Sequence, residues 1–195
     1  MQQEMNFIPY PSGFMRLALR LPILLYRMGL GGLLSLWPLM VLTTHGRKSG
    51  LPRFTALEFR QHGSKIYVIS GWGKRPQWYQ NLLSNPQATL RIGPRRVNAR
   101  ASVVDDPAEA VRVLYMFRRT APVLWDAILA RMSTADTIDL KTLGEVFDQF
   151  TIVRFDTMPE SPVLPAVSTD YTWVWPLAGV TLALVLVVRV LRSHR

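Results

Sequence analysis

The sequence predicts an α+β fold, in which an antiparallel β-barrel carries flanking helices and a C-terminal transmembrane helix. Short strand-like runs follow one another through tight turns, from "LMVLTT" at residue 39 to "RRVNARASVV" at residue 95. The long crossovers that parallel strands need are missing between them. Two helical patterns follow Asp105. Near the end of the chain lie sixteen uncharged residues, Trp173 to Val188.

The composition fits one packed domain and excludes several kinds of chemistry. Of the 195 residues, 49% are hydrophobic and only 18% are charged, which excludes an intrinsically disordered chain. Cysteine is absent, so disulfides, thiolate nucleophiles and cysteine-based metal sites are excluded. The histidines, His45, His62 and His194, are dispersed, and we expect no metal site.

The positive charge is concentrated in the middle of the chain. The formal net charge is +10, and residues 45–100 hold eleven Lys and Arg against one acid, Glu58. This local excess indicates a basic face or cleft for an anionic partner. A cofactor, a nucleic acid and an anionic lipid all carry suitable charge. Nucleic acid is disfavoured because the aromatic residues do not interleave with the cations.

Residues 1–36 are interpreted as an N-terminal amphipathic helix that associates with membranes. Arg16, Arg20 and Arg27 lie near one helical face, and leucines surround them. A first helix packed on the domain core explains the same pattern equally well. The segment lacks the small-residue cleavage site of a secretory signal.

Residues 37–156 are expected to form the barrel domain. A helix is expected over Pro76–Ser84, with the proline at its first position. Asp106, Pro107 and Glu109 form a helix start with an N-cap, a proline and an acid at the third position. A second helix is expected over Pro122–Met132. The expected strands are residues 39–44, 53–59, 65–71, 88–92, 95–104 and 150–156.

Two segments follow the barrel domain. Residues 157–171 are expected to be a linker, because "TMPESPVLPAVSTD" holds three prolines and neither Lys nor Arg. Residues 172–192 are expected to cross a membrane as a helix, with Trp at one interface and Arg at the other.

The stretch "THGRKSGLPR" places Arg47, Lys48 and Arg53 around two glycines and a proline, between two expected strands. A solvated turn explains these cations, and so does a site for an anionic ligand. Gly46 and Gly50 would let backbone amides approach a phosphate while the side chains add charge.

Three motifs read together resemble a known family: "LTTHGRKSGLPR", "ISGWGKRPQWYQNLLSNPQATLRIG" and "RRVNARA". In order and spacing they are similar to the deazaflavin-dependent nitroreductases, the split β-barrel flavin and deazaflavin oxidoreductases. The resemblance covers Leu39 to Ala101, about a third of the chain. It implies an FMN-binding-like split antiparallel barrel. It also implies the deazaflavin coenzyme F-420 as cofactor, with FMN as the alternative.

The resemblance also implies a set of site residues. Arg47, Lys48, Ser49 and Arg53 would hold the anionic cofactor tail, Ser70, Gly71, Trp72 and Lys74 would lie against its phosphate and ring, and Trp78 and Tyr79 would wall the site. Tyr115 is the candidate for the acceptor pocket, and no catalytic side chain is identified. A cofactor that brings its own electron chemistry explains a chain without cysteine or a catalytic dyad.

The predicted function is that of a membrane-anchored oxidoreductase. It would transfer a hydride from a reduced deazaflavin to a nitroaromatic or quinone-type acceptor. The alternative is a non-catalytic accessory or structural subunit of a larger membrane complex that keeps the barrel fold. We expect the barrel on the cytoplasmic side with the cofactor, although the arginines after the span favour the opposite orientation.

Overall fold

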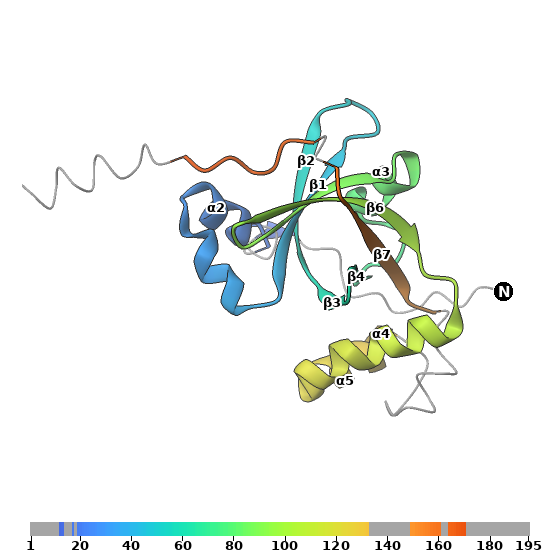
Figure 1. Ribbon diagram of the computed structural model, residues 1–195. Helices are drawn as coiled ribbons and strands as arrows, with labels where there is room; N and C mark the ends of the chain where they lie inside the picture. The colour runs from blue at the N-terminus through green and yellow to red at the C-terminus, as the bar shows by residue number, and fades with distance from the viewer. Residues whose placement is uncertain (1–11, 14–16, 18, 133–148, 161–163, 171–195) are drawn as a thin grey trace, which may run out of the picture.

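Figure 1 shows a computed structural model in which one curled antiparallel sheet carries helices on its outside. The structure describes residues 12–13, 17, 19–132, 149–160 and 164–170. The sheet has seven strands in the order β2-β1-β5-β6-β7-β4-β3. The strands are β1 (Leu39–His45), β2 (Pro52–Glu58), β3 (Arg60–His62), β4 (Lys65–Ser70), β5 (Gln87–Ile92), β6 (Arg95–Val103) and β7 (Thr151–Met158).

The sheet closes on itself because its two outermost strands are consecutive in the chain. Only Phe59 separates β2 from β3. Glu58 still pairs with β1, whereas Arg60 already pairs with β4. The amide of Phe59 donates to Pro38 O at 2.9 Å, so pairing with β1 continues up to the bend. One bent strand therefore joins both edges of the sheet. The predicted antiparallel barrel with flanking helices is confirmed.

The barrel interior is apolar and is built from alternate positions of the strands. Met40 and Leu42 of β1 pack there with Phe155 of β7. Helix α3 (Gln77–Ser84) adds Trp78 to the same cluster. This helix begins one residue later than expected, because Pro76 has an extended backbone and serves as the N-cap.

The outer face of β1 is covered by α2 (Leu21–Arg27) and the 3-10 helix η1 (Leu30–Leu36). Tyr26 of α2 is buried in a cluster with Val41, and its hydroxyl accepts a hydrogen bond from the Gly93 amide at 2.8 Å. The expected single helix over this region is interrupted because Gly29 takes a left-handed φ of 81°. The alternative prediction, a first helix packed on the domain core, is confirmed for the face of α2 that carries Tyr26.

Helices α4 (Pro107–Thr120) and α5 (Pro122–Met132) pack together outside the sheet (Figure 1). The predicted start of α4 is confirmed, because the Asp106 carboxylate accepts a hydrogen bond from the Glu109 amide at 3.0 Å. The predicted limits of α5 are also confirmed. The apolar face of α4, including Phe117, is buried between α5 and the sheet.

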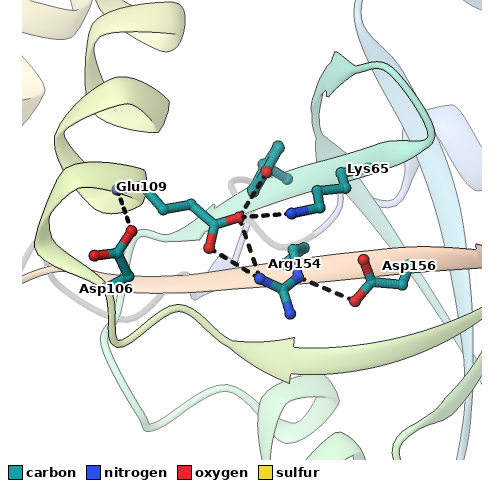
Figure 2. A network of polar contacts seen from close by, with 6 residues as sticks. Lys65, Asp106, Glu109, Arg154 and Asp156 are labelled. Atoms are coloured by element: carbon teal, nitrogen blue, oxygen red, sulfur yellow. Dashed lines mark hydrogen bonds and ion pairs between the residues drawn. The ribbon is translucent and has the colours of Figure 1, made fainter.

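Figure 2 shows the polar network that fastens α4 to the sheet. Glu109 accepts hydrogen bonds from the Tyr67 hydroxyl at 2.7 Å and from Arg154 Nη1 at 2.9 Å. The ammonium of Lys65 lies 3.6 Å from the same carboxylate. Arg154 Nε also donates to Asp156 at 3.0 Å. One carboxylate thus joins α4 to both β4 and β7.

The network couples the stability of the fold to pH. Burial by itself raises the pKa of Glu109, but the hydrogen bonds of Tyr67 and Arg154 and the charges of Arg154 and Lys65 outweigh burial and lower it. Burial, and then the hydrogen bond to Glu109, raise the pKa of Tyr67 to about 12. The stability that the Glu109 carboxylate contributes to the fold is therefore lost as the pH falls through its lowered pKa. The contribution of Tyr67 is lost as the pH rises from 10.0 toward about 12.

The segment after β7 packs against the barrel. Leu164 and Val167 are buried. Thr89 Oγ1 donates to Leu164 O at 3.0 Å, and the guanidinium of Arg91 donates to Val167 O. These residues lie within the expected linker 157–171, so part of that segment covers the outer face of β5. Its proline content predicted a linker, but its apolar side chains find a surface on the sheet.

The expected transmembrane segment, residues 172–192, lies outside the described residues. So do residues 1–11, 14–16 and 18 of the expected N-terminal helix, which include Arg16. Among the described helices, none is both long enough and apolar enough to cross a membrane.

Glu109→Gln is expected to lower the free energy of unfolding by about 2 kcal/mol at pH 7, because the buried partners of the carboxylate lose a charged acceptor. The difference should shrink as the pH falls below about 4.5, where the unfolded carboxyl is protonated. Urea denaturation at several pH values measures both effects. Glu160→Gln is the matched control, because Glu160 is exposed. Equal stability of parent and Glu109→Gln at pH 7 would show that the network does not fasten α4.

Candidate functional site

A cavity of about 360 Å3 lies between the β1–β2 loop and the start of α3. Its described lining includes Arg47, Lys48, Ser49 and Arg53 from the loop and β2, and Gln77, Trp78 and Asn81 from α3. Three of these residues are cations, and no acidic residue is found among the described lining residues. The cavity therefore has a positive potential suited to an anionic ligand.

The β1–β2 loop holds its cations on a tightly bonded turn. The Gly46 amide donates to Leu51 O at 2.9 Å, and the Gly50 amide donates to Gly46 O at 2.7 Å. Gly50 has a left-handed φ of 67°, and a Cβ at Gly46 would lie 3.0 Å from Leu51 O. Both glycine amides are used inside the turn, and the expectation that the glycines let backbone amides approach a phosphate stays a prediction. The positive charge of the cavity comes from side chains.

Asn81 fixes the loop to α3 and β1. Its side chain is buried, with 4% of the residue exposed. Its carbonyl oxygen accepts hydrogen bonds from the backbone amide of Arg47 at 3.2 Å and from Arg47 Nη1 at 3.4 Å. Its NH2 group donates to Thr44 Oγ1 at 3.1 Å. One amide therefore ties the end of β1, the loop and the helix together.

The loop cations are oriented by neutral partners. Arg47 Nη1 donates to Gln77 Oε1 at 2.8 Å, and Arg53 Nη2 donates to Ser49 Oγ at 3.2 Å. Lys48 is exposed beside them. Amide and hydroxyl oxygens hold a guanidinium in position without cancelling its charge. The charge of these side chains thus stays available to an anion.

The structure brings half of the sequence-predicted site residues together. Arg47, Lys48, Ser49, Arg53 and Trp78 line the cavity. The end of β4 and its connection to α3 hold four other predicted residues: Ser70, Gly71, Trp72 and Lys74. The strand pairing places this connection at the same end of the barrel as the β1–β2 loop. None of the four is among the described residues that line the cavity. The Ser70 hydroxyl donates to Gly73 O at 2.6 Å, so it shapes this connection.

The two predicted tyrosines lie outside the cavity lining. Tyr79 is buried in the barrel interior, where its ring meets that of Trp78 edge to face at 6.0 Å. Burial, and then the charge of Asp105, raise the pKa of Tyr79. Tyr115 lies on α4 with 40% of its surface exposed, and its acceptor role stays a prediction. The described residues hold no cluster of acidic or histidine side chains able to bind a metal ion.

The neutral residues that shape the site were not among the site residues predicted from the sequence. Gln77 and Asn81 contact Arg47, and Phe54 and Thr55 line the cavity. A signal for the first two was present, because Gln77 and Asn81 lie four residues apart and share one helical face. A polar stripe on a short helix with buried aromatics indicates buried hydrogen bonds. Nothing local in the sequence indicates their partner, 34 positions away from Asn81.

Comparisons with known families and with related proteins both find similarity to F420H(2)-dependent quinone reductases. The family model described as F420H(2)-dependent quinone reductase matches residues 24–128, more than half of the chain. Two curated relatives, F420H(2)-dependent quinone reductases of Mycobacterium tuberculosis strains H37Rv and CDC 1551, are each 33% identical over 70 residues. Each match covers 34% of this chain and 47% of the relative. The chain therefore spans about half the length of the curated relatives that it matches.

Similar solved structures are distant in sequence. A structure of a deazaflavin-dependent reductase (FDR-A) is 18% identical, with a TM-score of 0.44, and covers 60% of this chain and 93% of that chain. The heme storage protein HutZ of Vibrio cholerae is 15% identical, with a TM-score of 0.46, and covers 63% of this chain and 83% of that chain. At these TM-scores the likeness carries no argument about function.

Asn81→Leu is expected to loosen the β1–β2 loop without unfolding the barrel. The Arg47 amide and the Thr44 hydroxyl would lose their buried partner, at a cost of about 1–3 kcal/mol. Trypsin cleaves after Arg47 and after Lys48. Limited proteolysis at these two bonds should therefore become several-fold faster.

Asn81→Asp is the matched control for this experiment. Its carboxylate still accepts from the Arg47 amide and can accept a hydrogen bond from the Thr44 hydroxyl. Its cleavage rate should stay close to that of the parent chain. If Asn81→Leu is cleaved no faster than the parent, Asn81 does not hold the loop.

Proposed function

The chain belongs to the F420H(2)-dependent quinone reductase family, oxidoreductases that use a reduced deazaflavin, and we propose that it transfers a hydride from this cofactor to a quinone-type acceptor. A nitroaromatic compound is the other acceptor class we propose. The observation that carries the proposal is the placement of Arg47, Lys48 and Arg53 on a cavity without an acidic residue in its described lining.

The positive charge of the cavity supports a site for the anionic tail that the cofactor carries, a phosphate followed by glutamates. Arg47 and Arg53 are held by Gln77 and Ser49, so each guanidinium keeps donors for charge-assisted hydrogen bonds to the tail. Lys48 adds a third charge at the rim of the cavity. These side chains would bind the tail and fix its direction.

The remaining predicted residues would hold the other parts of the cofactor. Trp78 belongs both to the cavity lining and to the apolar interior, so it can wall the ring on the side of the barrel. Ser70, Gly71, Trp72 and Lys74 would meet the phosphate and ring from the connection before α3, with Tyr79 behind Trp78. The bound deazaflavin supplies the hydride chemistry, and the protein binds, orients and excludes water.

We also propose that the protein is anchored to a membrane through residues 172–192, with the barrel on the cytoplasmic side. The support is the uncharged run Trp173–Val188, which begins with two tryptophans and is followed by terminal arginines. A cytoplasmic barrel would share a compartment with the deazaflavin. A membrane-bound position would also bring the site close to lipid-soluble quinones, and a larger membrane complex is a compatible partner.

Purified protein is expected to bind oxidised coenzyme F-420 with an affinity that falls as salt concentration rises, because the tail contacts are ionic. A fluorescence titration at several salt concentrations measures this dependence. Absence of binding at low salt would contradict the enzymatic function and favour the accessory role.

The double variant Arg47→Ala/Lys48→Ala is expected to weaken cofactor binding by about 2–4 kcal/mol, from two charge-assisted contacts. Arg95→Ala/Arg96→Ala removes the same charge from the β5–β6 turn at the opposite end of the barrel and should leave binding near that of the parent chain. An equal loss in both double variants would mean that net charge, rather than the loop, attracts the cofactor.

A further inference from the structure

Helix α2 and the turn before it expose a face that carries leucines and arginines. We propose that this face docks on an anionic lipid bilayer and orients the barrel against it. Leu17, Leu21 and Leu24 are exposed at 67%, 53% and 52% of their surface, and Arg20 and Arg27 are exposed beside them. Single exposed leucines are common on soluble proteins, but several within eight residues form an apolar patch of the kind that marks an interaction site.

The five residues share one side of a helical turn. The Arg20 amide donates to Leu17 O at 2.9 Å, and the Leu24 amide donates to Arg20 O at 3.2 Å, so the turn before α2 leads directly into the helix. Spacings of three, four and seven residues bring side chains to the same helical face. The opposite face carries Tyr26, which is buried on the barrel. The leucines of this face thus remain exposed although α2 is packed on the barrel through its other face.

The chemistry of this face matches the surface of an anionic bilayer. Interfacial helices bury leucines at the boundary of head groups and acyl chains while arginines contact lipid phosphates. A second copy of the chain is a poorer occupant. The described charges of this face, Arg20 and Arg27, have one sign, so a two-fold contact would set like charges against each other.

The position of residues 164–170 supports the same occupant. The Asp170 amide donates to Arg27 O at 2.6 Å, and Arg91 holds Val167 and Thr169 on the sheet beside α2. Figure 1 shows this segment running to the side of the barrel that carries α2. The next residues in the sequence lead into the uncharged run 173–188. In sequence, the uncharged run therefore follows a segment that lies beside α2.

Docking through α2 would also place the cavity near the bilayer. Phe54 lines the cavity and packs against the cluster that contains Tyr26. Phe54 thus belongs both to the cavity lining and to the apolar cluster that packs beneath the docking helix. A lipid-soluble acceptor would have a short path to the site, a consequence that rests on the proposed function.

The absence of cysteine in the chain allows a direct test. The full-length variant Leu24→Cys, carrying an environment-sensitive fluorophore, is added to phosphatidylglycerol vesicles that contain brominated lipids. Val123→Cys is the matched control, because Val123 is 88% exposed on α5. We expect bromine to quench the label at position 24 at least twofold and to leave the label at position 123 nearly unchanged. Quenching at neither position, or equally at both, would overturn the proposal.

Two further measurements separate the remaining explanations. Disulfide formation between Leu24→Cys copies, without quenching by lipid, would overturn the proposal in favour of a second copy. Arg20→Glu/Arg27→Glu should reduce the quenching at position 24 on phosphatidylglycerol vesicles; unchanged quenching would contradict the role of charge. Neither measurement uses the cofactor, so failure of docking and failure of the deazaflavin titration are distinguishable.

Discussion

The barrel depends on one bend in its backbone, the passage from β2 to β3 through Phe59. Because Glu58 pairs with β1 and Arg60 pairs with β4, a single strand holds both edges of the sheet. Closure brings the end of β1 and the end of β4 to the same rim. The loop that follows β1 therefore meets the helix that follows β4, and Arg47 contacts Asn81 across 34 positions of sequence. The candidate site is a consequence of the way in which the sheet closes.

The cations at this rim differ in their partners from the arginines that form ion pairs within the fold. Arg154 and Arg60 are paired with carboxylates, those of Glu109 and Glu58, and these pairs fasten strands and helices. Arg47 and Arg53 are held instead by amide and hydroxyl oxygens. An arginine that is paired with a carboxylate has its charge neutralised within the fold. A cation with neutral partners can still bind an anionic ligand. Neutral partners beside a cavity, rather than the number of cations, are what we expect of a loop that binds an anion.

The fold could be predicted where the signal is local. The cap at Asp106 predicted the start of α4, and the proline at Pro122 predicted the start of α5. The local charge excess likewise predicted the basic loop. The roles of Asn81 and Gln77 could not be predicted, because their partner is distant in sequence. The segment 164–170 has the composition of a linker, and only the presence of an uncovered sheet face explains why it packs. Periodicity indicates which face of an element is apolar, but not what covers it.

A crystal structure of the protein with oxidised coenzyme F-420 would show whether the loop cations hold the cofactor tail. We expect the phosphate and carboxylates of the tail to lie within about 3.2 Å of the side-chain nitrogens of Arg47, Lys48 or Arg53. We also expect Asn81 to hold the loop as it does here. A tail bound at the opposite end of the barrel, near Arg95 and Arg96, with the loop cations facing solvent, would show that the loop is not the cofactor site.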